Sequence, residues 1–223
     1  VRFASSSQLE CTPQFSPDGK KIAFTSERSG KDQVWVCDSD GRNLIQLTSA
    51  RFAGTPRWSP DGRLIGYTVQ HIDFGSLYVV NAEGGTPRRL TEKTIDASSG
   101  SGSWSKDGKW IYFTSSRSGN FEIWRMPAEG GVAVQITRNG GFEAFESIDG
   151  KFLYFSKVDF RTASSTIWKI PVGESEESLV FDKTIHPRDW AVGEKGIYFI
   201  PRAEVHEPLL QFFSFETGRI TSV

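Results

Sequence analysis

The sequence predicts an all-β fold built from about five copies of one four-stranded unit. The motif FSPDGKKIAF at Phe15 returns as WSPDGRLIGY at Trp58, WSKDGKWIYF at Trp104, FESIDGKFLYF at Phe145 and WAVGEKGIYF at Trp190. The turn glycines Gly19, Gly62, Gly108 and Gly150 follow one another at intervals of 43, 46 and 42 residues. A period of roughly 40 to 45 residues with four strands per unit is typical of a β-propeller blade. We therefore predict a β-propeller.

Two sets of aromatic residues, which we call columns, recur at equivalent positions in the copies. The first column ends the second apolar segment of each copy and consists of Phe24, Tyr67, Phe113, Phe155 and Phe199. The second column lies in the third apolar segment and consists of Trp35, Tyr78, Trp124, Trp168 and Phe212. Aromatic residues that recur once per sheet suit packing between neighbouring blades better than a ligand platform. We interpret both columns as core.

The first copy shows how each element is predicted. Residues 12–16 form an inner strand, Ser16 to Gly19 a turn, residues 20–26 a second strand, 33–37 a third and 43–48 an outer one. Pro, Asp and Gly suit a tight hairpin, because Pro fixes φ, Asp bonds to the backbone and Gly accepts positive φ. The predicted blades are 11–48, 53–91, 98–137, 140–180 and 184–223. These form one array, either a fragment of a larger propeller or a self-contained five-bladed ring, and an open ring would permit self-association.

Composition excludes several function classes. The 223 residues carry a formal net charge of −1 with no block of like charges, so direct binding of nucleic acid by this segment is not expected. Cys11 and Cys37 are too few for a disulfide scaffold and are interpreted as small, half-buried side chains. No apolar run is long enough for membrane insertion, and we predict no cofactor.

The chain offers no convincing catalytic or metal motif. Gly100-Ser101-Gly102-Ser103 is the nearest approach to a nucleophile elbow and lacks the strand–helix context. His71, His186 and His206 lie far apart without metal-ligand spacing. Because Asp18, Asp61, Asp107 and Asp149 recur once per copy, we assign them to turn capping. The sequence therefore predicts a protein that is not an enzyme.

A binding site is expected where the copies differ. The predicted turns are nearly invariant, whereas the loops on the opposite rim vary, and loops on a rigid scaffold often carry function. The candidate binding rim consists of Arg51, Phe52, His71, Asp73, Phe74, Asp96, Arg138, Phe160, Arg161, His186 and His206. Phe and Arg are common in contact hot spots. We expect this rim to bind a protein, a peptide or a small-molecule ligand.

The repeat resembles the TolB-like propeller family, relatives of WD repeats. The resemblance rests on Pro13, Phe15 to Gly19, Trp35, Gly41 and Leu47-Thr48, and on their counterparts in later copies. The segments WSKDGKWIYF, IWRMPAEGG and QITRNGGFEAFES are most similar to propellers that lie C-terminal to winged-helix transcriptional regulators of bacteria. The wider family includes a periplasmic protein-binding propeller of the Tol system and the lid propellers of prolyl-oligopeptidase-type peptidases.

Three functions follow from the residues and this resemblance. The first is a non-catalytic binding, sensing or protein-interaction module within a larger bacterial regulatory protein. The second is the gating propeller of a serine peptidase whose catalytic domain is absent from these residues. The third is a purely structural scaffold. The sequence leaves the compartment open between cytoplasm and periplasm.

Overall fold

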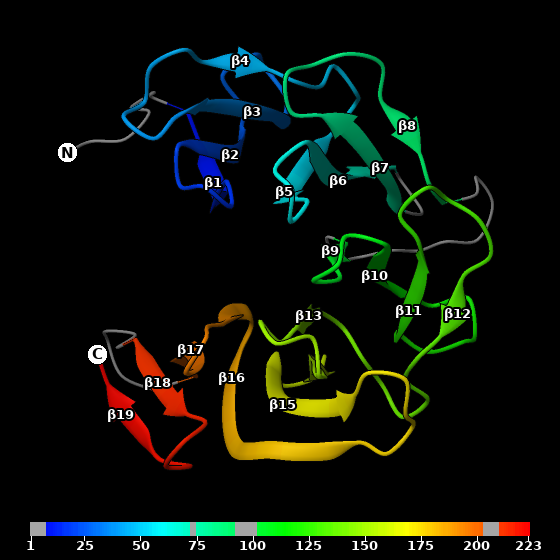
Figure 1. Cartoon of the computed structure of the whole chain (residues 1–223), viewed down its shortest axis with the longest axis vertical. Coiled ribbons are helices and arrows are strands. Elements are labelled where there is room, and N and C mark those ends of the chain that lie inside the picture. Colours follow the sequence, from blue (N-terminus) through cyan, green and yellow to red (C-terminus); the bar gives the residue numbers. More distant parts are fainter. Residues whose placement is uncertain (1–7, 72–74, 92–101, 203–209) are drawn as a thin grey trace.

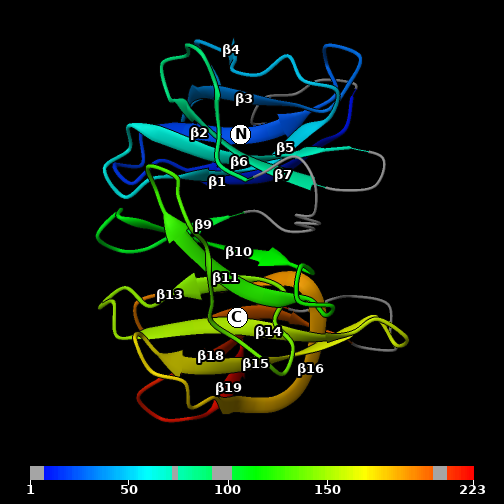
Figure 2. The same ribbon diagram turned by 90° about the vertical axis from the view of Figure 1, so that its right-hand side faces the viewer.

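The computed structural model describes residues 8–71, 75–91, 102–202 and 210–223, and it confirms the all-β propeller. The blades form an arc around a common centre, with the inner strands toward the middle and the labelled termini on one side (Figure 1). Turned by 90°, the same blades lie one above another as layers (Figure 2). None of the described residues forms a helix long and apolar enough to cross a bilayer.

The first three blades are separate four-stranded antiparallel sheets. Blade 1 contains β1 (Glu10–Phe15), β2 (Lys21–Ser26), β3 (Gln33–Asp38) and β4 (Ile45–Gln46). Blade 2 contains β5 (Ala53–Trp58), β6 (Leu64–Gln70), β7 (Gly75–Asn81) and β8 (Arg88–Arg89). Blade 3 contains β9 (Ser103–Trp104), β10 (Trp110–Ser115), β11 (Glu122–Pro127) and β12 (Val134–Gln135).

The last two blades share one long strand. A seven-stranded sheet runs from β13 (Ala144–Glu146), β14 (Phe152–Asp159) and β15 (Ser164–Pro171) through β16 (Ser178–Val192) to β17 (Gly196–Pro201), β18 (Gln211–Ser214) and β19 (Ile220–Ser222). The first part of β16 is the outer strand of blade 4, where Leu179 pairs with Trp168. Its last part is the inner strand of blade 5, where Trp190 pairs with Phe199. One bent strand therefore joins blades 4 and 5.

The turns predicted from the SPDG motif form as hairpins. In blade 1, Ser16 Oγ donates to Asp18 Oδ1 at 2.7 Å, and the same carboxylate oxygen accepts from the Lys20 amide at 3.1 Å. Gly19 has φ of 71°, a left-handed conformation that a glycine adopts without strain. The equivalent Ser–Asp bonds recur in the next three blades at 2.6 to 2.7 Å. The repeated aspartates are turn caps.

The hydrophobic core lies between the blades. Ala23, Val34 and Val36 of blade 1 pack with Ile65 and Tyr67 of blade 2, and each later seam has a comparable cluster. The first aromatic column is buried as well, since all five members are at most 2% exposed; Tyr67, Phe113, Phe155 and Phe199 lie in these clusters, and Phe24 packs with Ile22, Trp35 and Cys37 of its own blade. Burying one such side chain is worth about 1.5–3 kcal/mol. The seams therefore hold the arc together.

The predicted positions of the second aromatic column are confirmed in four blades and wrong in the fifth. Trp35, Tyr78, Trp124 and Trp168 stand directly across from the first column on the neighbouring strand. In blade 5, however, Phe212 pairs with Tyr198, while Gln211 stands opposite Phe199. Because a shift of one residue reverses the face of a strand, Phe213 and not Phe212 packs into the core cluster of this seam.

Tryptophans also tie neighbouring inner strands together. Trp58 Nε1 of blade 2 donates to the Gln14 carbonyl of blade 1 at 3.0 Å, and Trp104 Nε1 of blade 3 donates to the Arg57 carbonyl of blade 2 at 3.0 Å. In blade 4, Glu146 takes the place of the tryptophan and its Oε2 accepts from the Lys106 amide at 2.9 Å. At blade 1 the equivalent Phe15 is 61% exposed. Blades 1 and 5 share no sheet among the described strands.

Candidate functional site in the axial cavity

A cavity lies along the axis of the arc. It has a volume of about 860 Å³ and is lined by the inner strands of all five blades: β1, β5, β9, β13 and the last part of β16. It runs from Thr12, Thr55 and Arg188 to residues of the turns such as Pro60 and Ile148. This volume lies in the range of about 300–1,000 Å³ that is common for ligand pockets. We call it the axial cavity.

Three residues on this wall have an unusual backbone. Thr12, Thr55 and Arg188 have φ of 53°, 54° and 72°, and they are three of the five non-glycine residues with positive φ in the described part of the chain. Each lies where the register of an inner strand shifts against its neighbour. Positive φ is a strong outlier for a β-branched residue such as Thr. The bulges displace these residues from the regular strand and place them on the cavity wall.

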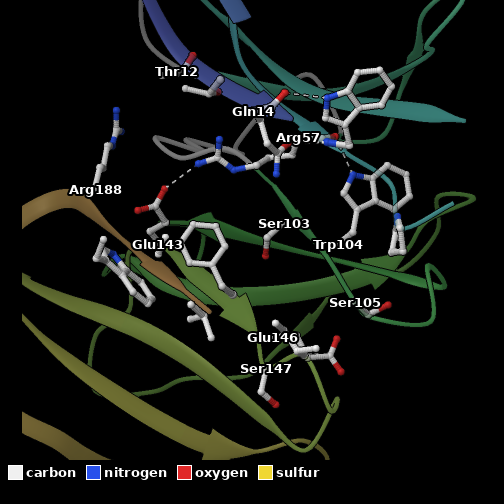
Figure 3. Close-up of a pocket in the computed structure, with 18 of the residues that line it drawn as sticks. Thr12, Gln14, Arg57, Ser103, Trp104, Ser105, Glu143, Glu146, Ser147 and Arg188 are labelled. Atoms are coloured by element: carbon white, nitrogen blue, oxygen red, sulfur yellow. Dashed lines mark hydrogen bonds and ion pairs between the residues drawn. The ribbon is translucent and has the colours of Figure 1, made fainter. Parts of the chain in front are cut away.

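A buried ion pair crosses the cavity wall between blades 2 and 4. Arg57 Nη2 lies 3.4 Å from Glu143 Oε1, and the side chain of Glu143 is only 5% exposed. Figure 3 shows the Glu143 carboxylate between Arg57 and Arg188. The guanidinium of Arg57 also lies over the ring of Phe145, with its carbon 5.6 Å from the centroid. Residues from blades 2, 4 and 5 therefore form one charged cluster.

Burial dominates the electrostatics of this cluster. It raises the pKa of Glu143, while the positive charges of Arg57 and Arg188 act in the opposite direction. Burial likewise lowers the pKa of Arg57, which Glu143 opposes and the nearby charge of Arg188 reinforces. Glu143 Oε2 has no hydrogen-bond partner among the described residues. The pair therefore places two charged groups on the cavity wall, and one carboxylate oxygen accepts no bond from the described protein groups.

A second cavity adjoins the axial one at the loop face. It has a volume of about 340 Å³, and Thr55 and Arg188 line both cavities. Phe52, one of the predicted rim residues, is 43% exposed and lines this second cavity, and the Arg51 guanidinium lies 5.8 Å from the centroid of its ring. The structure thus brings Arg51 and Phe52 to the entrance of the axial cavity.

Phe160 belongs to an aromatic cluster nearby. It is 60% exposed, and its ring centroid lies 5.4 Å from that of Phe121 and 5.7 Å from that of Phe142. The Arg188 guanidinium lies 5.2 Å from the centroid of Phe142. Phe160 is therefore linked to the entrance of the axial cavity through Phe142 and Arg188.

The other rim residues whose side chains the structure describes are not brought together. Arg161 is exposed and its amide donates to Asp159 at 2.9 Å, Arg138 lines a separate cavity of about 220 Å³ between blades 3 and 4, and His71 is half-buried. His186 lies in β16, but its side chain is outside the described set. Asp73, Phe74, Asp96 and His206 fall in segments outside the described residues.

The cavity wall could have been identified from one variable column. The residue just before the Phe15, Trp58, Trp104, Glu146 and Trp190 column is different in every copy: Gln14, Arg57, Ser103, Phe145 and Asp189. All five line the axial cavity. In the described residues no group of three His, Cys, Asp or Glu side chains could hold a metal ion.

This arrangement is a β-propeller with a charged, partly aromatic cavity on its axis. The TolB beta propeller domain family matches residues 2–186, so the chain belongs to that family. A TolB homolog of Chlorobaculum tepidum is 35% identical over 51 residues, which is 23% of this chain and only 12% of that protein's length.

Solved structures support the same fold. TolB from Acinetobacter baumannii matches with a TM-score of 0.81 and 22% identity, covering 97% of this chain and 54% of that one. A puromycin-hydrolyzing peptidase of Mycobacterium tuberculosis matches with a TM-score of 0.73 and 15% identity, covering 96% of this chain and 38% of that one. At these identities the likeness shows the fold alone.

Proposed function

We propose that this chain is a non-catalytic protein-interaction module whose axial cavity receives an extended segment of a protein partner. The observation that carries the proposal is that one column of the inner strands lines this cavity and differs in every blade: Gln14, Arg57, Ser103, Phe145 and Asp189. The turns beside this column repeat from blade to blade because they build the fold. A surface that diverges on a repeated scaffold is better explained by binding than by folding.

The entrance lies at the loop face, beside Arg188, Phe52 and the Phe160 cluster. Phe52 lines the loop-side cavity, and Phe160 packs on Phe142, which lies against Arg188. Aromatic and arginine side chains are the usual anchors of protein interfaces, so we propose that the partner contacts the inner part of the expected rim. The wider context that we infer is the sensing part of a larger bacterial regulatory protein, on the resemblance of segments such as IWRMPAEGG.

A gating propeller of a serine peptidase is the second candidate, because the peptidase of M. tuberculosis has a similar propeller over 38% of its chain. The two candidate functions predict different domains beside the propeller. An adjoining hydrolase domain with a nucleophile elbow would favour the peptidase, and an adjoining winged helix would favour the regulator.

Substituting one arginine in the axial cavity and one on the outer rim tests which of the two surfaces binds the partner. Linear peptides are first selected from a phage library for binding to the wild-type chain. Their affinities for the wild-type chain, for Arg188→Ala and for Arg161→Ala are then measured by fluorescence anisotropy. Arg188 lines the cavity, whereas Arg161 is 93% exposed beside Asp159. We expect Arg188→Ala to weaken binding by about tenfold or more and Arg161→Ala to leave it unchanged.

Two outcomes would contradict the proposal. If Arg161→Ala weakens binding and Arg188→Ala does not, the partner binds the outer rim. If selection yields no peptide that binds more tightly than roughly 100 μM, the cavity is not a peptide site.

A further inference from the structure

Buried polar atoms without a hydrogen-bond partner gather on the wall of the axial cavity. Among the described residues, eight buried side-chain nitrogen and oxygen atoms have no such partner. Three of these atoms, Ser103 Oγ, Glu143 Oε2 and Trp190 Nε1, belong to residues that line this cavity. All three residues are at most 6% exposed. Because buried polar groups in native proteins nearly always find a partner, this gathering calls for a ligand that supplies the missing bonds.

Trp190 departs from the repeat in its hydrogen bonding. It stands at the position of Trp58 and Trp104, whose indoles each donate to a carbonyl of the preceding inner strand at 3.0 Å. The ring of Trp190 packs instead edge to face against Phe145, with the two centroids 4.9 Å apart. Its indole N–H is therefore an unused donor.

An unused acceptor lies beside this donor. Glu143 Oε1 accepts from Arg57 Nη2 at 3.4 Å, whereas Oε2 accepts from no described group. Glu143 precedes Phe145 by two residues, so the two side chains share one side of the strand and the same cavity wall (Figure 3). The terminal torsion of a carboxylate is soft, so rotation about it can present Oε2 to a ligand. A donor and an acceptor thus both adjoin the ring of Phe145.

The charges on the cavity wall balance. Three basic side chains and three acidic ones line it: Arg57, Lys106, Arg188, Glu143, Glu146 and Asp189. Such a wall gives no net attraction to a charged group. A neutral amide carries one N–H donor side and one C=O acceptor side, and it can therefore satisfy both unused atoms.

We propose that the axial cavity binds an uncharged amide of the partner segment. Its N–H donates to Glu143 Oε2, and its C=O accepts from Trp190 Nε1. The inference rests on the proposed function and names the chemical group that the cavity recognises. This amide belongs either to the main chain of the partner or to an Asn or Gln side chain.

The indole N–H of Trp190 reports directly on this bond. After assignment of the indole signals of the wild-type chain in a ¹H–¹⁵N spectrum, a peptide selected from the phage library is added. We expect the Trp190 signal to move downfield, because its N–H gains an acceptor. The Trp124 signal should stay in place, since Trp124 Nε1 is also buried without a partner among the described residues but does not line this cavity. A Trp190 signal that stays in place on peptide binding would overturn the proposal.

A matched pair of substitutions measures the contribution of the donor to affinity. Trp190→Phe keeps an aromatic ring against Phe145 and removes the N–H, so it should weaken peptide binding by about fivefold or more. Trp124→Phe should leave binding unchanged. Circular dichroism and the melting temperature check that both variants fold, and the spectrum of the wild-type chain decides the question where Trp190→Phe does not.

Changes in the peptide identify the source of the amide. Asn→Leu and Gln→Met remove side-chain amides, and N-methylation at single positions removes one main-chain N–H at a time. We expect one of these two sets to contain a change that weakens binding by about fivefold or more. A loss confined to the first set assigns a side chain, and a loss confined to the second assigns the main chain. No loss in either set would overturn the amide site.

Two further results separate this inference from the proposed function. If Trp190→Phe binds the peptide as tightly as the wild-type chain, while Arg188→Ala still weakens binding, the amide site is overturned and the peptide cavity stands. If selection yields no peptide, N-methylacetamide is compared with N,N-dimethylacetamide, which lacks the N–H. A larger shift of the Trp190 signal with N-methylacetamide would support the amide site while the peptide function fails. Equal shifts, or none, would overturn the amide site.

Discussion

The turn face and the axial cavity use carboxylates in opposite ways. Asp61 is largely exposed in its turn, and the hydroxyl of Ser59 and the amide of Arg63 lower its pKa. Glu143 is buried in the cavity wall, and that burial raises its pKa. The first carboxylate has counterparts in three other blades, whereas the second occurs in blade 4 alone. In this chain, repetition marks residues that stabilise every blade, and departure from the repeat marks the candidate site.

The largest effect is expected from Glu143→Ala. This substitution leaves the Arg57 guanidinium buried without its carboxylate, which should lower the free energy of unfolding by about 3 to 5 kcal/mol. Urea denaturation at neutral pH measures the change, and Asp61→Ala in a turn is the matched control. A loss below about 1 kcal/mol would mean that water already solvates the Arg57 guanidinium, and the contrast between the two regions would be smaller than we infer.

A smaller loss of stability is expected from substituting a residue that recurs in other blades. Trp104→Phe removes the indole bond to the Arg57 carbonyl and should lower the free energy of unfolding by about 1 to 2 kcal/mol. Trp124→Phe is the control, because Trp124 Nε1 is buried without a hydrogen-bond partner among the described residues. Equal losses in the two variants would show that ring size, and not the bond between blades, sets the stability of this seam.

Much of the fold could be predicted from the sequence because each blade repeats the same local signals. The SPDG turns and the alternating strands define a hairpin without knowledge of the rest of the chain. The error at Phe212 arose because the fifth copy has lost the Asp-Gly turn that aligns the other copies, so spacing alone does not distinguish Phe212 from Phe213. The shared strand β16 is not predicted, because the repeat describes each copy as a separate sheet.

The candidate site was predicted only in part. The rule that function lies where the copies differ directs attention to the loops, but the copies also differ in their inner strands. The column of Gln14, Arg57, Ser103, Phe145 and Asp189 was available in the sequence. The ion pair between Arg57 and Glu143 was not, because 86 residues separate the two and only the curvature of the arc brings them together. The left-handed backbone of Arg188 likewise depends on the bend between blades 4 and 5.

The smallest effect concerns the pH dependence of the turns. Hydrogen bonds from the serine hydroxyl and a backbone amide lower the folded-state pKa of Asp18, Asp61, Asp107 and Asp149. A lowered folded pKa stabilises the fold above the unfolded value of about 3.9, and that contribution is lost as the pH falls through the folded value. Asp61→Asn should therefore lose less stability than the wild-type chain when urea denaturation is repeated from about pH 5 down to pH 2.

Asp182→Asn, an exposed substitution outside the turns, is the control for this titration. If Asp61→Asn and the wild-type chain lose the same stability on acidification, the carboxylate of the turn is not a charged cap. The SPDG motif would then act through its glycine and proline alone. Because the four turns are equivalent, the effect should be larger in a variant that carries Asp→Asn at all four positions.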